Sequence, residues 1–412
     1  MEQHSDLFGN SGIPPAPPPS NDNAWLELEV HAATLFTPST PISEEELFAG
    51  RVDLLRRMID DIYQEGQHAV LYGERGIGKS SLANILKDKI FSKVARFKVI
   101  KRSCTAEHDF KLIWQHLFSE YQYEGIPAPD WIAGHHNPFD IYQLIDATAV
   151  DVRPIFIIDE FDRISDEKTK LMMADTIKYL SDYASKATII LVGVAKNVSQ
   201  LIANHQSIGR NLDQIPILRM VPGELEQILL KRFILLNMNA EGHVKQKIIA
   251  LSQGLPGYTH RIGREAALNA IRRRTQTISE FDLGEALKHV ISGADEVMSK
   301  AYADAIRSTK PQNKYKEVLL ACAMAQTDDR GYFSASSVKK PLTSILSEPR
   351  EIPSFARHLN EFCDESRGPV LVKDGRPKSY QYQFYEPLLR PYVVIRGIAD
   401  KLISHQDIPL VS

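Results

Sequence analysis

The stretch LYGERGIGKSSLANIL, residues 71–86, is the most informative part of the sequence. It matches the pattern G-x-x-x-x-G-K-[ST] completely, with an apolar strand pattern before it and a helix pattern after it, as this motif requires. In such a loop, backbone N–H groups surround phosphate oxygens, the helix N-terminus adds partial positive charge and the lysine reaches the β and γ phosphates. We therefore predict a nucleotide-binding loop made of Gly73, Glu74, Arg75, Gly76, Ile77, Gly78, Lys79, Ser80 and Ser81.

A pair of acidic residues complements this loop. PIFIIDEFD, residues 154–162, places Asp159 and Glu160 at the end of an apolar run. A nucleotide in the loop needs a carboxylate for Mg²⁺ and, if it is hydrolysed, a group that orients water. We expect Ser80 and Asp159 to bind the metal, and Lys79 and Glu160 to act in hydrolysis. ATP and Mg²⁺ are the predicted cofactors.

The fold class follows from the pattern around these motifs. Short β-branched or apolar runs alternate with helical patterns, and the runs are HAVLYG, ARFKVIKRSC, RPIFIIDE, ATIILVGVA and QIPILRM. Parallel neighbours need crossover connections, so alternating strands and helices predict a parallel sheet covered on both faces. We expect an α/β P-loop core with a five-stranded parallel sheet over residues 24–220.

Four further segments flank this core. Residues 1–23 are rich in proline and are expected to form a disordered tail, whereas the pattern over 221–306 is helical and predicts a lid domain. Residues 307–313 have linker composition. Residues 314–405 show three helices followed by a hairpin, which fits a winged helix, a helix-turn-helix variant.

Composition limits the class of protein. The chain has 412 residues, of which 43% are hydrophobic and 25% charged, so it is neither disordered nor fibrous. The net charge of -3 argues against wholesale coating of nucleic acid. Three scattered cysteines favour a reducing compartment, and no apolar run approaches the roughly 18 residues that span a bilayer. We expect a cytoplasmic protein without a membrane contact.

These residues resemble the AAA+ ATPases, most closely the branch of the origin recognition complex and archaeal initiators, and they share features with the STAND signalling ATPases. LFAGR, residues 47–51, resembles the segment that packs on adenine, or it is a helix cap with Phe48 in the core. GLPG, residues 254–257, resembles the element that places a proline, here Pro256, against the base.

The resemblance also implies roles for three cationic or titratable residues. His260 and Arg261 stand where AAA+ proteins keep a basic residue facing the γ phosphate, although Arg261 also fits a solvated helix position. Arg210 resembles the arginine finger that acts on a neighbouring subunit's nucleotide, which implies a homo-oligomer. Its alternative is a cap or ion pair on the preceding helix.

The fourth strand departs from the AAA+ pattern. Members of that class place a polar residue at its tip, but here it ends Val192, Gly193, Val194 and Ala195, and Asn197 comes two residues late. We therefore expect slow hydrolysis with low turnover, and a nucleotide that serves as a switch.

The C-terminal region carries the candidate contacts to double-stranded DNA. They are Arg350, Arg357, His358, Lys373, Arg376 and Lys378. Glu361, Asp364 and Glu365 oppose them along the third helix, so contact with a protein, or packing within the chain, is the alternative.

Two functional hypotheses follow. The first is a slowly hydrolysing AAA+ ATPase, a nucleotide-gated switch that assembles on DNA through its winged helix, as in initiation, transposition or defence against mobile elements. The second is a STAND-like signalling ATPase that oligomerises and recruits a protein effector without binding DNA.

Overall fold

The computed structural model describes residues 16–38, 50–62, 64–90, 96–149, 152–202, 211–308, 310, 313–376 and 379–408. They divide into two compact units. The described residues of Pro41–Glu74 and Gly78–Ile217 form the first unit, and most of the second comes from Leu218–Ser412, joined by Ser11–Thr40.

The first unit is built on the predicted sheet of five parallel strands. Their spatial order is β2-β5-β6-β1-β7, so the phosphate-loop strand β1 lies between two strands that come later in the sequence. The fold-class prediction is confirmed. The strands are β1 His68–Gly73, β2 Phe97–Ser103, β5 Arg153–Asp159, β6 Thr188–Val194 and β7 Leu212–Pro216.

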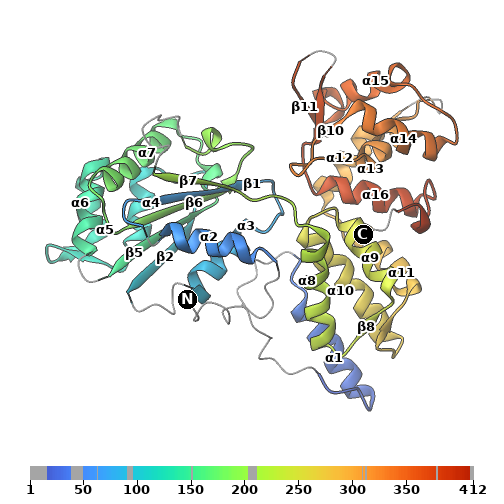
Figure 1. Cartoon of the computed structure of the whole chain (residues 1–412), viewed down its shortest axis with the longest axis horizontal. Helices are drawn as coiled ribbons and strands as arrows, with labels where there is room; N and C mark the ends of the chain where they lie inside the picture. Colours follow the sequence, from blue (N-terminus) through green and yellow to red (C-terminus); the bar gives the residue numbers. More distant parts are fainter. Residues whose placement is uncertain are drawn as a thin grey trace. The chain divides into compact units, whose positions relative to one another are not determined.

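Helices cover both faces of this sheet (Figure 1). Because successive residues of a strand point to opposite faces, the apolar residues 154–158 of β5 serve two layers at once. The longer connections form one layer, and α3, which follows β1, packs on the other face. The helices are α2 Val52–Ile62, α3 Lys79–Ile85, α4 Phe110–Leu117, α5 Ala128–Gly134, α6 Pro138–Thr148 and α7 Glu167–Asp182.

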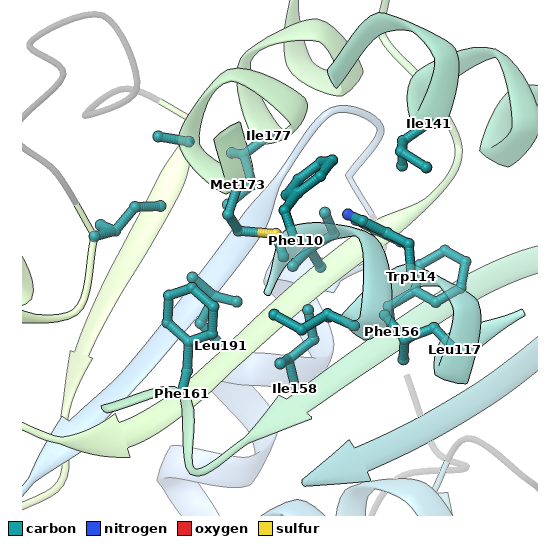
Figure 2. Packing of buried hydrophobic residues seen from close by; sticks show 14 of the residues in the cluster. Phe110, Trp114, Leu117, Ile141, Phe156, Ile158, Phe161, Met173, Ile177 and Leu191 are labelled. Atoms are coloured by element: carbon teal, nitrogen blue, oxygen red, sulfur yellow. The ribbon is translucent and has the colours of Figure 1, made fainter. Parts of the chain in front are cut away.

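A hydrophobic cluster lies between the sheet and the layer of α4, α6 and α7 (Figure 2). Trp114 at its centre is fully buried, and its ring meets the ring of Phe156 edge-on at 5.5 Å. Phe156 and Ile158 reach this cluster from β5. Asp159 is thus the last residue of a strand held on both faces by packed side chains, which fixes the position of its carboxylate.

The second unit contains the predicted helical region. Two short parallel strands, β8 Asn239–Ala240 and β9 Thr277–Ile278, tie its helices together. The helices are α1 Asp22–Leu35, α8 Pro222–Leu235, α9 Gly242–Ser252, α10 Pro256–Arg272, α11 Glu280–Ser292 and α12 Glu296–Ile306.

Helix α1 packs in this second unit. Leu28, Ala32 and Leu35 are buried on it, and it contacts α10. Arg272 of α10 also pairs with Glu29 at 2.8 Å. The sequence boundary at residue 24 grouped this helix with the sheet instead. A buried helix face does not say which neighbour it packs against, so local patterning gave no means of assigning it.

The C-terminal part of the second unit has the element order helix, strand, helix, helix, strand, strand. The strands form an antiparallel sheet in the order β10-β12-β11, and β11 and β12 are joined by a turn at Gly375, whose φ is 98°. The elements are α13 Tyr315–Met324, β10 Phe333–Ser334, α14 Ala335–Leu346, α15 Ile352–Glu361, β11 Leu371–Asp374, β12 Gln381–Phe384 and α16 Leu389–Ala399. Among the described helices of both units, none is long and apolar enough to cross a membrane.

Candidate nucleotide and magnesium site

The predicted phosphate loop connects β1 to α3. Gly76 and Gly78 have φ angles of 80° and 90°, in the left-handed region that side chains disfavour. Helix α3 begins at Lys79 directly after Gly78. The glycines thus provide a turn that only they adopt without strain, and a helix N-terminus follows it, as anion binding requires.

Lys79 is held inside this turn. Its side chain is buried, and Nζ donates to the carbonyl oxygens of Gly73 at 3.2 Å and Glu74 at 2.7 Å. Burial lowers the pKa of Lys79 to about 8, and the charge of Arg51 acts in the same direction, against the opposing carboxylates of Asp162 and Asp159. The ammonium is therefore poorly compensated, and an anion in the loop would stabilise its charged form.

Ser80 and Asp159 lie together as predicted for a metal site. Ser80 Oγ is 3.3 Å from Asp159 Oδ1, which also accepts from the backbone N–H of Glu160 at 2.9 Å. No group of three or more His, Cys, Asp or Glu side chains gathers as a metal cage in the described chain. One hydroxyl and one carboxylate fit Mg²⁺, which takes its other ligands from substrate phosphates and water.

A cation already lies on the Asp159 carboxylate. Lys101 Nζ, from β2, is 2.9 Å from Asp159 Oδ2 and donates to Asn84 Oδ1 at 2.6 Å. Sequence reasoning missed both residues. The neighbour of β2 in the sheet is β5, and that strand order is not visible in a single sequence.

Glu160 and Asp162 follow β5. Glu160 has a φ of 55°, an uncommon conformation for a residue other than glycine, and its carboxylate pairs with Arg163 at 3.1 Å. Asp162 Oδ1 accepts from the backbone N–H of Val194 at 2.8 Å. This loop therefore connects the end of β5 to the tip of β6 through a hydrogen bond. The role of Glu160 in orienting water stays a prediction.

The tip of the fourth strand in sequence, β6, presents no polar side chain. Val194 occupies it with 42% of its surface exposed. Asn197 lies beyond the strand, where its Oδ1 accepts from Ser199 Oγ at 2.6 Å. The departure noted in the sequence is therefore a property of the folded strand.

The predicted lid residues have structural partners in the second unit. Pro256 lies in the first turn of α10. His260 is buried, its Nδ1 accepts from the Thr37 N–H at 3.2 Å, and burial followed by the charge of Arg232 holds its pKa well below the ordinary value. Arg261 donates to the carbonyl oxygen of Gly293. Contacts of Pro256, His260 and Arg261 with nucleotide stay predictions.

Two other predictions fall partly or wholly outside the described residues. Arg210, the predicted arginine finger, lies outside them, as do residues 47–49 of the predicted adenine segment. Arg51 at the end of that segment is described, and its charge acts on Lys79.

Three of the six candidate DNA contacts of the C-terminal region, Arg350, Arg357 and Lys373, contact carboxylate or amide oxygens. Arg350 pairs with Glu348 at 2.6 Å, and Lys373 Nζ donates to Asn360 Oδ1 at 3.3 Å. His358 packs edge-on against a tyrosine ring, Arg376 is described beside Gly375, and Lys378 lies outside the described residues.

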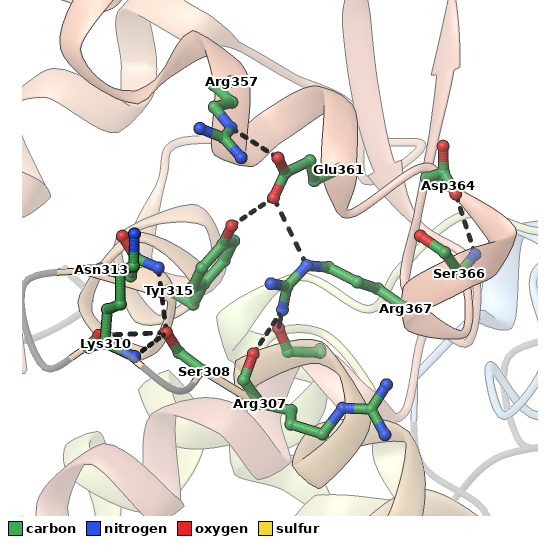
Figure 3. Close-up of polar contacts among 11 residues, drawn as sticks. Arg307, Ser308, Lys310, Asn313, Tyr315, Arg357, Glu361, Asp364, Ser366 and Arg367 are labelled. Atoms are coloured by element: carbon green, nitrogen blue, oxygen red, sulfur yellow. Dashed lines mark hydrogen bonds and ion pairs between the residues drawn. The ribbon is translucent and has the colours of Figure 1, made fainter.

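Glu361 is the centre of a polar network at the end of α15 (Figure 3). It accepts from Arg357 Nε at 2.6 Å and from the Tyr315 hydroxyl, and it pairs with Arg367 at 3.4 Å. The Tyr315 hydrogen bond, followed by Arg357, holds the pKa of Glu361 below its ordinary value. Arg367 also donates to the carbonyl oxygen of Arg307 at 2.9 Å, which ties α15 to the preceding segment.

Together, the parallel sheet, the glycine turn before α3 and the acid at the end of β5 define a P-loop ATPase fold. Residues 61–202 match the family model described as "AAA domain". The resemblance to AAA+ ATPases is thereby confirmed for the first unit.

Three solved structures are similar to this chain. The Walker-type ATPase paby2304 of Pyrococcus abyssi is 17% identical, with 88% of this chain and 99% of that chain covered and a TM-score of 0.52, which indicates a shared fold. The ORC2 protein of Aeropyrum pernix is 15% identical over 97% of this chain and 98% of that one, with a TM-score of 0.43. The Thermotoga maritima RuvB branch migration motor is 12% identical over 84% and 94%, with a TM-score of 0.43. A search of curated proteins found no match.

Proposed function

We propose that the protein is an AAA+ ATPase of the initiator-like branch that binds Mg·ATP in the loop of residues 73–81 and hydrolyses it slowly. One observation carries this proposal. The glycine turn, the buried Lys79 and the Ser80–Asp159 pair lie at one end of the sheet, where β1 and β5 end. Ligands of open α/β sheets bind at the carboxyl ends of the strands.

Each residue has a separate task. The loop N–H groups and Lys79 hold the phosphates, and Lys79 exchanges its bonds to Gly73 and Glu74 for phosphate oxygens. Ser80 and Asp159 would hold Mg²⁺, which would supply positive charge to the phosphates. Glu160 orients the attacking water once it leaves Arg163.

Slow turnover follows from two features of the site. No polar side chain at the tip of β6 positions the water, and the Glu160 carboxylate already has a partner in Arg163. A nucleotide that stays bound for a long time suits a protein that changes state when ATP binds better than one that uses repeated hydrolysis to drive movement. Arg210, by its resemblance to an arginine finger, would couple hydrolysis to a neighbouring copy of the chain.

We place DNA binding in the C-terminal part of the second unit. Its order of elements, with the β11–β12 hairpin after α15, supports the prediction of a winged helix. Lys373 and Arg376 stand on this hairpin and can reach phosphates. The region would then join copies of the chain on double-stranded DNA when ATP is bound.

A second function is favoured by the polar network around Glu361. Arg357, a candidate DNA contact on α15, pairs with Glu361, which reduces the positive charge that α15 offers to a phosphate backbone. A STAND-like signalling ATPase, in which this surface contacts a protein effector, is therefore the alternative.

Glu160→Gln tests the assigned reaction, because the substitution keeps the shape of the side chain and removes its basicity. We expect the variant to bind ATP with wild-type affinity and to hydrolyse it at least about 100-fold more slowly. Phosphate release and equilibrium binding should be measured on the same samples. Glu167→Gln on α7, whose carboxylate is exposed and pairs only with Lys170 among the contacts seen in the structure, is the matched control.

Equal hydrolysis rates in Glu160→Gln and the wild type would remove Glu160 from the mechanism. Loss of binding together with hydrolysis would instead show that Glu160 supports the nucleotide site itself.

A further inference from the structure

Lys101 is an unusual neighbour for a metal carboxylate. Its side chain is only 13% exposed and that of Asp159 only 5%, so the pair is largely removed from water. The ammonium sits 2.9 Å from Asp159 Oδ2. A carboxylate and an ammonium this close and this buried attract strongly, because little solvent screens them.

The hydrogen bonds of the Asp159 carboxylate are divided between its two oxygens. Oδ1 accepts from Ser80 Oγ and the Glu160 N–H, while Oδ2 faces Lys101. Asn84 stands four residues after Ser80 on α3, so both side chains lie on one face of the helix. Asn84 Oδ1 accepts from the same Lys101 ammonium at 2.6 Å. Lys101 therefore links β2, β5 and α3 at the place where the metal is expected.

We propose that Lys101 is a positioning residue that serves as the resident counter-ion of Asp159 and sets how much Mg²⁺ the site requires. This inference rests on the proposed function, since it concerns the same Mg·ATP site. Without metal, Lys101 neutralises Asp159, so the triphosphate meets less repulsion. When the metal is bound, Lys101 and Mg²⁺ compete for the negative charge of the same Asp159 carboxylate, even if each cation contacts a different oxygen.

Two opposite effects of removing the charge follow. Lys101→Met keeps the length of the side chain but leaves Asp159 free for the metal, so nucleotide binding should reach its midpoint at a lower Mg²⁺ concentration. Because the ammonium lies 2.9 Å from the carboxylate in a largely buried site, we expect its removal to shift the Mg²⁺ midpoint about tenfold. In EDTA the same variant should bind ATP several-fold more weakly than the wild type, because the carboxylate is then uncompensated.

The experiment is a Mg²⁺ titration of full-length protein with a fluorescent ATP analogue at fixed concentration, with a parallel arm in EDTA. Lys101→Arg keeps the charge and should keep the wild-type midpoint. Lys98→Met is the matched control, because Lys98 lies on the same strand but holds its ammonium over the Tyr121 ring, 3.7 Å from the centroid, rather than on the Asp159 carboxylate. Thermal unfolding establishes that each variant is folded, and Lys101→Gln supplies a second uncharged variant if Lys101→Met is not.

The outcomes separate this inference from the proposed function. If the wild-type protein binds the analogue and the uncharged variants have the same Mg²⁺ midpoint, the proposed role of Lys101 is overturned. The assignment of the nucleotide site is then unaffected. Equal midpoint shifts in Lys98→Met and Lys101→Met would also overturn it, because the effect would then come from the strand's charge in general. A wild-type protein that binds no nucleotide at any Mg²⁺ concentration overturns both.

Discussion

Lys79 is the residue whose ionisation should be most visible in solution. Burial lowers its pKa to about 8, so in the nucleotide-free protein it loses its proton above that pH. The triphosphate binds the protonated form better, so binding takes up a proton above pH 8 and the affinity falls as pH rises. We expect ATP to bind roughly tenfold more weakly at pH 9 than at pH 7.5, measured as Kd in saturating Mg²⁺.

Lys79→Arg is the control for this pH dependence, since arginine stays protonated across the range. The variant should bind ATP with an affinity that changes little between pH 7.5 and 9, whatever its absolute value. An equal loss of affinity in the variant and the wild type would assign the titration to another group.

For individual residues, the sequence alone identified those members of the candidate nucleotide site that belong to contiguous motifs. Ser80 and Asp159 lie 3.3 Å apart as expected, although 79 positions separate them, because a strand and a loop of known type position them. Lys101 and Asn84 could not be found this way. Their part in the site depends on which strand lies next to β5 in the sheet. The spacing of residues along the sequence does not predict that strand order.

Among the elements, β1 and β6 are also linked by the side chain of a buried histidine. His68 is 1% exposed, and its Nδ1 accepts from the Ile189 N–H at 3.0 Å. Burial, followed by the charge of Arg153, lowers its pKa to about 3. Below pH 6.5 the unfolded ring takes up a proton that the folded ring does not, so the free energy of unfolding falls as pH falls from 6.5 toward 3.

The expected loss from His68 is about 1.4 kcal/mol per pH unit within that window, or about 2 kcal/mol between pH 6.5 and 5. Urea unfolding followed by tryptophan fluorescence measures it, because Trp114 and Trp131 lie in the first unit. His68→Asn keeps an acceptor near the Ile189 N–H but cannot ionise, so its stability should depend less on pH. An unchanged pH slope in this variant would show that other groups cause the acid sensitivity.

Element types were predictable where patterning was strong. The runs that became β1, β5 and β6 are apolar on both faces, and only a strand covered by two helix layers buries such a run. The packing of α1 was not predictable, because its buried face fits any apolar surface. The polar network at Glu361 was also not predictable in detail, although Glu361 itself was visible as a charge opposing DNA.

For the whole molecule, the two functional hypotheses differ in what ATP does to size and to DNA affinity. The switch hypothesis expects a larger species on gel filtration with ATP than with ADP, and a still larger one when duplex DNA is added. Lys373→Ala/Arg376→Ala should weaken the DNA complex and lower its salt slope by about one for each phosphate that the variant no longer binds. Lys300→Ala/Lys310→Ala removes the same charge elsewhere and is the control.

ATP-dependent growth without any DNA complex would favour the signalling alternative instead. An elution volume that is the same with ADP, with ATP and with ATP plus DNA would contradict both hypotheses of nucleotide-gated assembly. Arg210→Ala should reduce assembly with ATP if Arg210 acts on a neighbouring copy.

All of these expectations depend on Mg·ATP binding in the loop before α3. Calorimetric titration of the wild type and of Lys79→Ala with ATP and Mg²⁺ tests it most directly. The wild type should bind one nucleotide per chain, and Lys79→Ala should lose about 2–3 kcal/mol of binding free energy, as removal of a charged hydrogen-bond donor does. Absence of binding by folded wild-type protein, or equal affinity in the two proteins, would contradict the assignment of this loop as the nucleotide site.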